Sequence, residues 1–100
     1  MTYRTSLEPK RAAEKIEAVF DFSTQVAVGE TVDSATTVST LYSGTDAAPG
    51  DVVSGATSIS GGQVTQLLIG GVAGNVYLIT CTAVTDAPET LIRTAYLVVI

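Results

Sequence analysis

Short runs in which every second residue is apolar are the feature of this sequence that most limits its fold. In the run VYLITCTAVT at 76–85, one alternating set consists of Tyr77, Ile79, Cys81 and Ala83. Alternation with a period of two residues predicts a half-buried β-strand, and β-branched and aromatic residues favour the same structure. The preceding GGVAG at 70–74 predicts a turn, because glycine tolerates positive φ angles.

A membrane helix is the alternative for this region, because Val52–Thr85 carries no charge. A spanning helix needs about 20 mostly apolar residues. Here the apolar pieces are only a few residues long, and they are interrupted by Thr65, Gln66, Asn75, Thr80 and Thr82. The composition therefore favours strands, and we expect no contact with a membrane.

The same pattern recurs along the chain between turn-forming stretches such as DAAPGD and TDAPE. The segment PKRAAEK, after Pro9, could add one helical turn. Strands are expected near 16–22, 32–41, 63–69, 76–85 and 90–100, and VVSGATSISGG at 52–62 is expected to supply one or two more. About seven short strands predict an all-β fold, a Greek-key β-sandwich of the immunoglobulin or fibronectin type III kind. We expect one domain at 16–100, preceded by an N-terminal arm at 1–15.

Charge and composition exclude several classes of function. Four of the five basic residues lie in the first fifteen positions, which gives that segment a net charge of about +2 and leaves about −7 for the rest. An acidic body argues against nucleic-acid binding. The chain has no histidine and one cysteine, so no His-based catalytic pairing and no Cys-rich metal site can form. We therefore expect no enzymatic activity, no cofactor and no metal.

The turn and strand around Tyr77 resemble a recurring pattern of immunoglobulin-like domains. An apolar residue, Leu68, precedes the glycines, and Tyr77 then opens an alternating strand. The resemblance implies that Tyr77 is a corner tyrosine whose hydroxyl bonds nearby backbone.

Most of the chain, from about Pro9 to Ile100, also resembles small virion proteins of tailed bacteriophages. The matching stretches are AVFDFS at 18–23, VGETV at 28–32, QLLIGGVAGNVYLITCTAVT at 66–85 and AYLVVI at 95–100. The resemblance implies a non-enzymatic structural protein of the virion, made in the bacterial cytoplasm. Its partners would be portal, adaptor or neck proteins, with the neck or head–tail connector favoured over decoration of the capsid lattice. A cell-surface adhesion or carbohydrate-binding module is the alternative from another class.

Three groups of polar residues were considered as sites. Glu14, Glu17 and Asp21 are predicted to lie along a solvated edge rather than to bind a metal. Asp46 and Asp51 flank Pro49-Gly50, where aspartate commonly bonds its own backbone, although a calcium site is an alternative. Cys81 is expected to be a buried, inert thiol.

The last strand suggests a surface for self-association into a homo-oligomer. If Tyr96, Val98 and Ile100 face the core, as the phage resemblance suggests, then Leu97 and Val99 face outward. Together with Leu78 on the neighbouring strand they would form an apolar patch, which usually marks an interface. A register slip of one residue would exchange the two faces.

The N-terminal segment, residues 1–15, is either a frayed tail or a docking arm. As an arm it would bind an acidic neighbouring subunit by charge complementarity and strand addition, through Tyr3, Arg4, Lys10 and Arg11. Fifteen extended residues reach roughly 45 Å.

Overall fold

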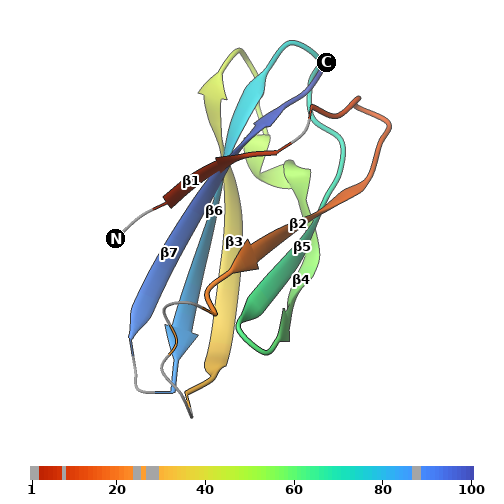
Figure 1. Cartoon of the computed structure of the whole chain (residues 1–100). Helices are drawn as coiled ribbons and strands as arrows, with labels where there is room; N and C mark the ends of the chain where they lie inside the picture. Colours follow the sequence, from red (N-terminus) through yellow and green to blue (C-terminus); the bar gives the residue numbers. More distant parts are fainter. Residues whose placement is uncertain (1–2, 8, 24–25, 27–29, 87–88) are drawn as a thin grey trace.

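The chain forms two β-sheets that pack face to face (Figure 1). The computed structural model describes residues 3–7, 9–23, 26, 30–86 and 89–100, with the backbone alone for 3–6. The elements in chain order are β1 (Tyr3–Ser6), β2 (Ile16–Asp21), β3 (Val32–Ser43), the short 3-10 helix η1 (Pro49–Val52), β4 (Val53–Ser60), β5 (Gln63–Leu68), β6 (Val76–Thr85) and β7 (Thr90–Val98).

One sheet has the strand order β1-β7-β6-β3 and the other has the order β2-β5-β4. All neighbouring strands are antiparallel except β1, which runs parallel to β7. The chain passes from one sheet to the other after β1, β2, β3 and β5. The predicted all-β sandwich of about seven strands is therefore confirmed. The seventh strand, β1, lies in the segment predicted to be an arm.

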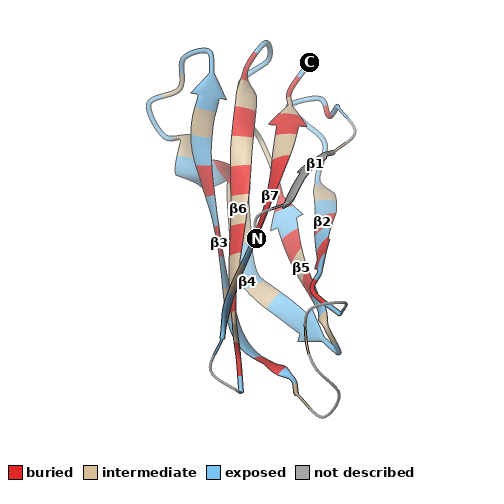
Figure 2. Ribbon diagram, turned by 60° about the vertical axis from the view of Figure 1, so that its left-hand side comes forward, coloured by how far each residue is buried: buried red, intermediate tan, exposed pale blue. Residues whose placement is uncertain are grey.

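The core lies between the two sheets and is built from alternate residues of each strand (Figure 2). On β6 the predicted inward set is confirmed, since Tyr77, Ile79, Cys81 and Ala83 are fully buried. The facing sheet contributes Phe20, Val64 and Leu68, among others. Each large apolar side chain buried in this way contributes about 1.5–3 kcal/mol to folding.

The orientation predicted for β7 is wrong by one residue. Leu97 and Val99 are fully buried, whereas Tyr96 and Val98 are half-buried on the outer side of the sheet. The cause is the pairing with β6, which sets Leu97 opposite the inward-facing Tyr77. Both alternating sets of this strand are apolar, so the sequence pattern alone does not select the inner one. Leu97 and Val99 are core residues and provide no association surface.

Arg93 belongs to the same inward set as Leu97 and Val99. Its side chain is buried, and the guanidinium carbon lies 5.1 Å from the centroid of the Phe22 ring. A cation held over an aromatic face in this way is stabilised by the ring quadrupole. The sandwich thus encloses one arginine beside Phe22, the aromatic residue that follows β2.

The segment before β2 contains a single turn, closed by a hydrogen bond from Glu14 N–H to Arg11 O at 3.0 Å. In the described part of the chain, no helix is both long and apolar enough to cross a membrane.

Candidate binding surface

Between Ser34 and Tyr42 on β3, and along β6 and β7, the outward side of the four-stranded sheet carries no charged residue. The exposed Asp33 lies beyond this stretch, at the start of β3. We call this uncharged surface the outer face. It consists of Thr36, Val38, Thr40 and Tyr42 on β3, Leu78, Thr80 and Thr82 on β6, and Ile92, Thr94, Tyr96 and Val98 on β7. The strands pair so that Thr40, Leu78 and Tyr96 form one row across the sheet, and Thr36, Thr82 and Ile92 form another. The outer face is therefore a continuous surface of hydroxyl, aliphatic and tyrosine side chains.

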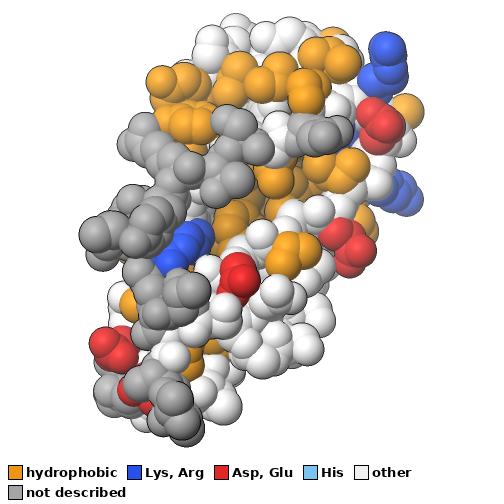
Figure 3. All heavy atoms as spheres, viewed as in Figure 1, with side chains coloured by type: hydrophobic (Ala, Val, Ile, Leu, Met, Phe, Trp, Pro, Cys, Tyr) orange, Lys and Arg blue, Asp and Glu red, His pale blue; other side chains and the backbone are white. Residues whose placement is uncertain are grey.

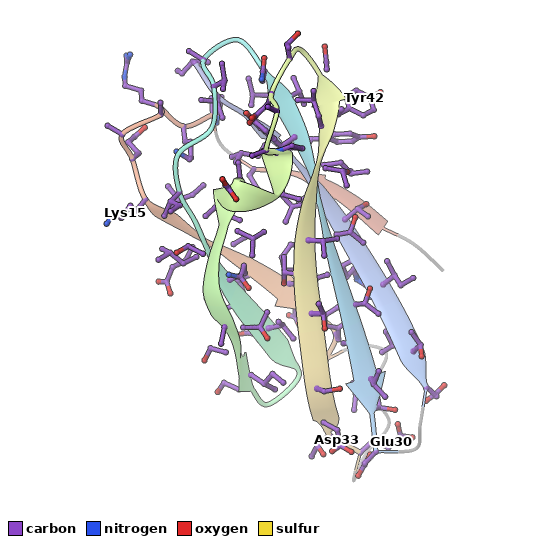
Figure 4. The ribbon with its side chains drawn as sticks, turned by 180° about the vertical axis from the view of Figure 1, so that it is seen from behind. Lys15, Glu30, Asp33 and Tyr42 are labelled. Atoms are coloured by element: carbon purple, nitrogen blue, oxygen red, sulfur yellow. The ribbon has the colours of Figure 1, made fainter. Side chains whose placement is uncertain are left out.

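Tyr42 is the most exposed large apolar residue of the outer face, at 62 %. Its ring packs edge-to-face on Tyr96, with centroids 4.8 Å apart and an interplanar angle of 68°. Figure 4 shows Tyr42 projecting from one end of β3, away from the other sheet. Val38 and Ile92 add exposed aliphatic groups, 49 % and 37 % exposed. Leu78 faces outward as predicted and is half-buried between its neighbours.

The sequence predicts Leu78 in an apolar patch on this side, but not the other five apolar members, Val38, Tyr42, Ile92, Tyr96 and Val98. The signal was present in the alternation of β3, because the outward positions 36, 38, 40 and 42 lack charge as the inward ones do. The prediction that Tyr96 lies in the core came from the resemblance to the phage proteins, which puts Tyr96, Val98 and Ile100 on the inward set.

The corner before β6 is held by the Tyr77 hydroxyl, which confirms the predicted role of this residue. The hydroxyl accepts a hydrogen bond from Val72 N–H at 2.8 Å and donates one to Asp46 Oδ2 at 2.7 Å. Asn75 Nδ2 donates to the same hydroxyl at 3.3 Å and to Thr45 O at 2.9 Å. These bonds tie the loop that follows β3 to the turn that precedes β6, and so fix the end of the sheet that carries Tyr42.

Asp46 also makes the local backbone bond expected of a turn residue, since Ala48 N–H donates to Oδ1 at 2.9 Å. The Ala48 amide and the Tyr77 hydroxyl together lower the pKa of the Asp46 carboxyl below its usual value. Asp46 and Asp51 line a cavity of about 340 Å³ with Val52, Ile69 and neighbouring residues. Within the described ranges, no group of three or more His, Cys, Asp or Glu side chains is arranged to hold a metal ion.

The other predicted polar residues lie apart from the outer face. Glu14 Oε1 accepts a bond from Arg11 N–H at 2.6 Å, and Asp21 Oδ1 accepts one from Ser23 N–H at 2.8 Å. Glu17 is exposed on β2. Cys81 is buried as predicted, and burial raises the pKa of its thiol.

Lys10 does not present its charge to a partner, contrary to our expectation for the docking arm. The residue is 1 % exposed, and Nζ donates to Arg11 O and Glu14 O, both at 2.8 Å. Burial lowers the pKa of this ammonium, while the nearby Glu14 carboxylate acts in the opposite direction. Its backbone bonds Val98 O and Ile100 N–H. Lys10 therefore anchors the N-terminal segment to the end of β7.

The structure describes the other predicted docking residues, Arg11, Tyr3 and Arg4, to different extents. Arg11 and Lys15 are exposed, and Figure 3 shows basic side chains at the surface beside the segment that precedes β2. The backbone of Tyr3 pairs with Arg93, and that of Arg4 pairs with Thr94, whereas both side chains lie outside the described part. Docking by this segment stays a prediction.

Comparison with known proteins gives one family. Residues 10–98 match the model of the family Gp77, described as "Podophage GP4 fiber-tail adaptor protein gp77". A search of curated proteins gave no match.

Proposed function

Because the chain belongs to the family of the podophage GP4 fiber-tail adaptor protein gp77, a structural protein of tailed phages, we propose that it joins a fibre to the tail of the virion. The protein acts by binding and not as an enzyme. An adaptor holds two neighbours at once and therefore needs two contact surfaces. We assign one to the outer face and the other to the N-terminal segment.

The absence of charge from the outer face is the observation that supports the first contact. The cores of protein interfaces are depleted in charged residues and enriched in tyrosine. The outer face has both properties, because Tyr42 and Tyr96 are in contact and Val38 is exposed among several threonine side chains. The matching partner surface would be uncharged as well, because burying a charge against these side chains would leave it unpaired.

Charge complementarity supports the second contact. The N-terminal segment is net positive while the rest of the chain is net negative, so it favours an acidic surface. Since Lys10 is buried, docking relies on Tyr3, Arg4 and Arg11. We place this contact on the tail side, in the neck or head–tail connector region.

Particles assembled with variant protein test the outer face. The pair Tyr42→Asp and Ile92→Asp puts two charges on the outer face at exposed positions, so the fold should persist. We expect virions that lack either the fibre or the adaptor, depending on which neighbour the face holds, as counted by electron microscopy. Val19→Asp is the matched control, because Val19 is 54 % exposed on the opposite sheet. Normal fibre-bearing particles from the double variant would reject this contact.

Removal of residues 1–9 tests the docking segment and leaves the Lys10 anchor in place. We expect the shortened protein to fold, by circular dichroism, but to be lost from the tail. Arg4→Glu with Arg11→Glu should have the same effect if charge is the cause. Retention of the shortened protein on particles would contradict the docking role.

A further inference from the structure

Strand β3 has a free edge that is long and uncharged. Among the described strands it has a neighbour on one side only, β6. Thr57 Oγ1 donates to Ala35 O at 2.9 Å from the β4 side, so the backbone groups of Ala35 point to the free edge. By the alternation of a strand, those of Thr37 and Ser39 point the same way. Such an edge is a template for another strand.

Two buried hydroxyls lie beside this edge without a nitrogen or oxygen hydrogen-bond partner among the described residues, Thr37 Oγ1 and Ser39 Oγ. The two residues are only 8 % and 5 % exposed and face inward. Thr37 lies opposite Cys81 and interacts with its thiol, which is only a weak hydrogen-bonding group. A buried hydroxyl without a hydrogen bond costs folding free energy, so we expect these two hydroxyls to find partners outside the chain.

The edge is also open to approach. Pairing of β4 with β5 shifts register between Ser54 and Ser58, which takes residues 55–57 out of the ladder. A cavity of about 250 Å³ results, lined by Thr37 on β3 together with Ala56 and Gln66 on the other sheet. The Gln66 amide is already satisfied by backbone, with Nε2 2.8 Å from Ser54 O. Thr37 is thus a buried lining residue whose hydroxyl still lacks a nitrogen or oxygen partner in the described part.

We propose that β3 pairs antiparallel with β3 of a second copy of the chain, about a two-fold axis at Val38. This register sets Thr37 of each copy directly opposite Ser39 of the other. Hydroxyl pairs of this kind hydrogen-bond across antiparallel strands, so each unpartnered group in one copy satisfies its counterpart in the other. The two four-stranded sheets become one continuous sheet.

Because each copy supplies the hydroxyl groups that the other copy needs, a second copy fits this edge better than an unrelated strand does. Residues 34–43 carry no charge, so self-pairing sets no like charges opposite each other. Val38, 49 % exposed, meets Val38 of the second copy on the outer side. The backbone groups that point outward belong to the odd-numbered residues, which makes Thr37–Ser39 a hydrogen-bonded pair and Val38–Val38 a non-hydrogen-bonded one. The same axis joins the outer faces of the two copies.

Disulfide trapping tests the register on the full-length protein. Opposed residues of a non-hydrogen-bonded pair have Cα atoms about 4.5 Å apart, within disulfide range. Val38→Cys, oxidised with copper phenanthroline, should therefore form a covalent dimer about tenfold or more faster than Val19→Cys, an equally exposed position on another edge strand. Thr36→Cys alone should remain at the Val19→Cys rate, but a mixture of Thr36→Cys and Thr40→Cys should cross-link. Wild-type protein gives the baseline for the buried Cys81.

Sedimentation velocity tests the association itself. A strand-edge contact buries little surface and gives a weak dimer, so concentrations up to the order of 1 mM are needed to populate it. Val38→Lys should abolish the dimer by setting two ammonium groups against each other, while Val19→Lys should leave it unchanged. A strict monomer, a dimer insensitive to Val38→Lys, or equal trapping at positions 38 and 19 would each overturn the proposal. None of these measurements involves a fibre or a tail, so their outcome is independent of the adaptor role.

Discussion

The two ends of the sandwich place carboxylates in opposite surroundings. At one end, Asp46 receives hydrogen bonds from the Ala48 amide and the Tyr77 hydroxyl, and its pKa is lowered. At the other end, burial raises the pKa of the Glu30 carboxyl, and the nearby Glu89 and Asp86 raise it further. Figure 4 shows Glu30 and Asp33 at the end of β3 away from Tyr42.

The difference shows that the presence of a carboxylate does not by itself tell whether that end of the sandwich stabilises the fold. Asp46 lies next to a turn and accepts hydrogen bonds from the Ala48 amide and the Tyr77 hydroxyl. Glu30 Oε2 is buried without a hydrogen-bond partner in the described part. The Tyr77 end should therefore tolerate substitution least, because its polar groups already make hydrogen bonds. The Glu30 end should tolerate neutralisation of its carboxylate.

The largest effect is expected at the satisfied end. Tyr77→Phe keeps the buried ring but removes the bonds to Val72 N–H and Asp46, and should lower the free energy of unfolding by about 1–3 kcal/mol in urea denaturation. Tyr42→Phe is the control, because its hydroxyl belongs to a side chain 62 % exposed, and should change stability by less than about 0.5 kcal/mol. Equal effects would show that the corner bonds contribute nothing.

A smaller effect concerns the titration of Asp46. Without the Tyr77 hydroxyl the carboxylate loses one donor, so the Asp46 pKa should rise in Tyr77→Phe, as followed by NMR of the carboxyl carbon. Because the folded pKa lies below the ordinary value of 3.8, the charged group stabilises the fold above that pH, and this contribution is lost as pH falls through the folded pKa. The stability difference between wild type and Tyr77→Phe should therefore narrow in acid. An unchanged Asp46 pKa would assign its shift to the Ala48 amide alone.

The fold was largely predictable because its information is local. Alternation on β6 named its four core residues correctly, and glycine and proline marked the turns. A local pattern fails where both faces of a strand are apolar, as on β7. There the choice between Tyr96 and Leu97 depends on the pairing with β6, which no single segment contains.

The binding surface was less predictable than the fold, because it also depends on contacts that no local pattern contains. That β1 pairs with β7, and that the backbone of Lys10 bridges to Val99, depends on contacts between the two ends of the chain. The sequence shows the lysine as one of several basic residues and does not separate it from Arg11. Tyr77 was identified, but its partner Asp46 lies thirty-one residues away, and no spacing rule connects them.

The smallest effect is expected at the acidic end, and it has the opposite sign. Glu30→Gln removes a partly buried charge that Glu89 and Asp86 repel, so it should raise the melting temperature at pH 7. The folded pKa lies above the ordinary 4.5, so the folded state holds its proton longer, and stability falls as pH rises through this window. The gain from Glu30→Gln should thus disappear near pH 4. Asp33→Asn, which removes an exposed carboxylate at the same end, should give a smaller gain. An equal rise in melting temperature for the two variants would show that the effect comes from net charge. The contrast between the two ends would then not depend on the burial of Glu30.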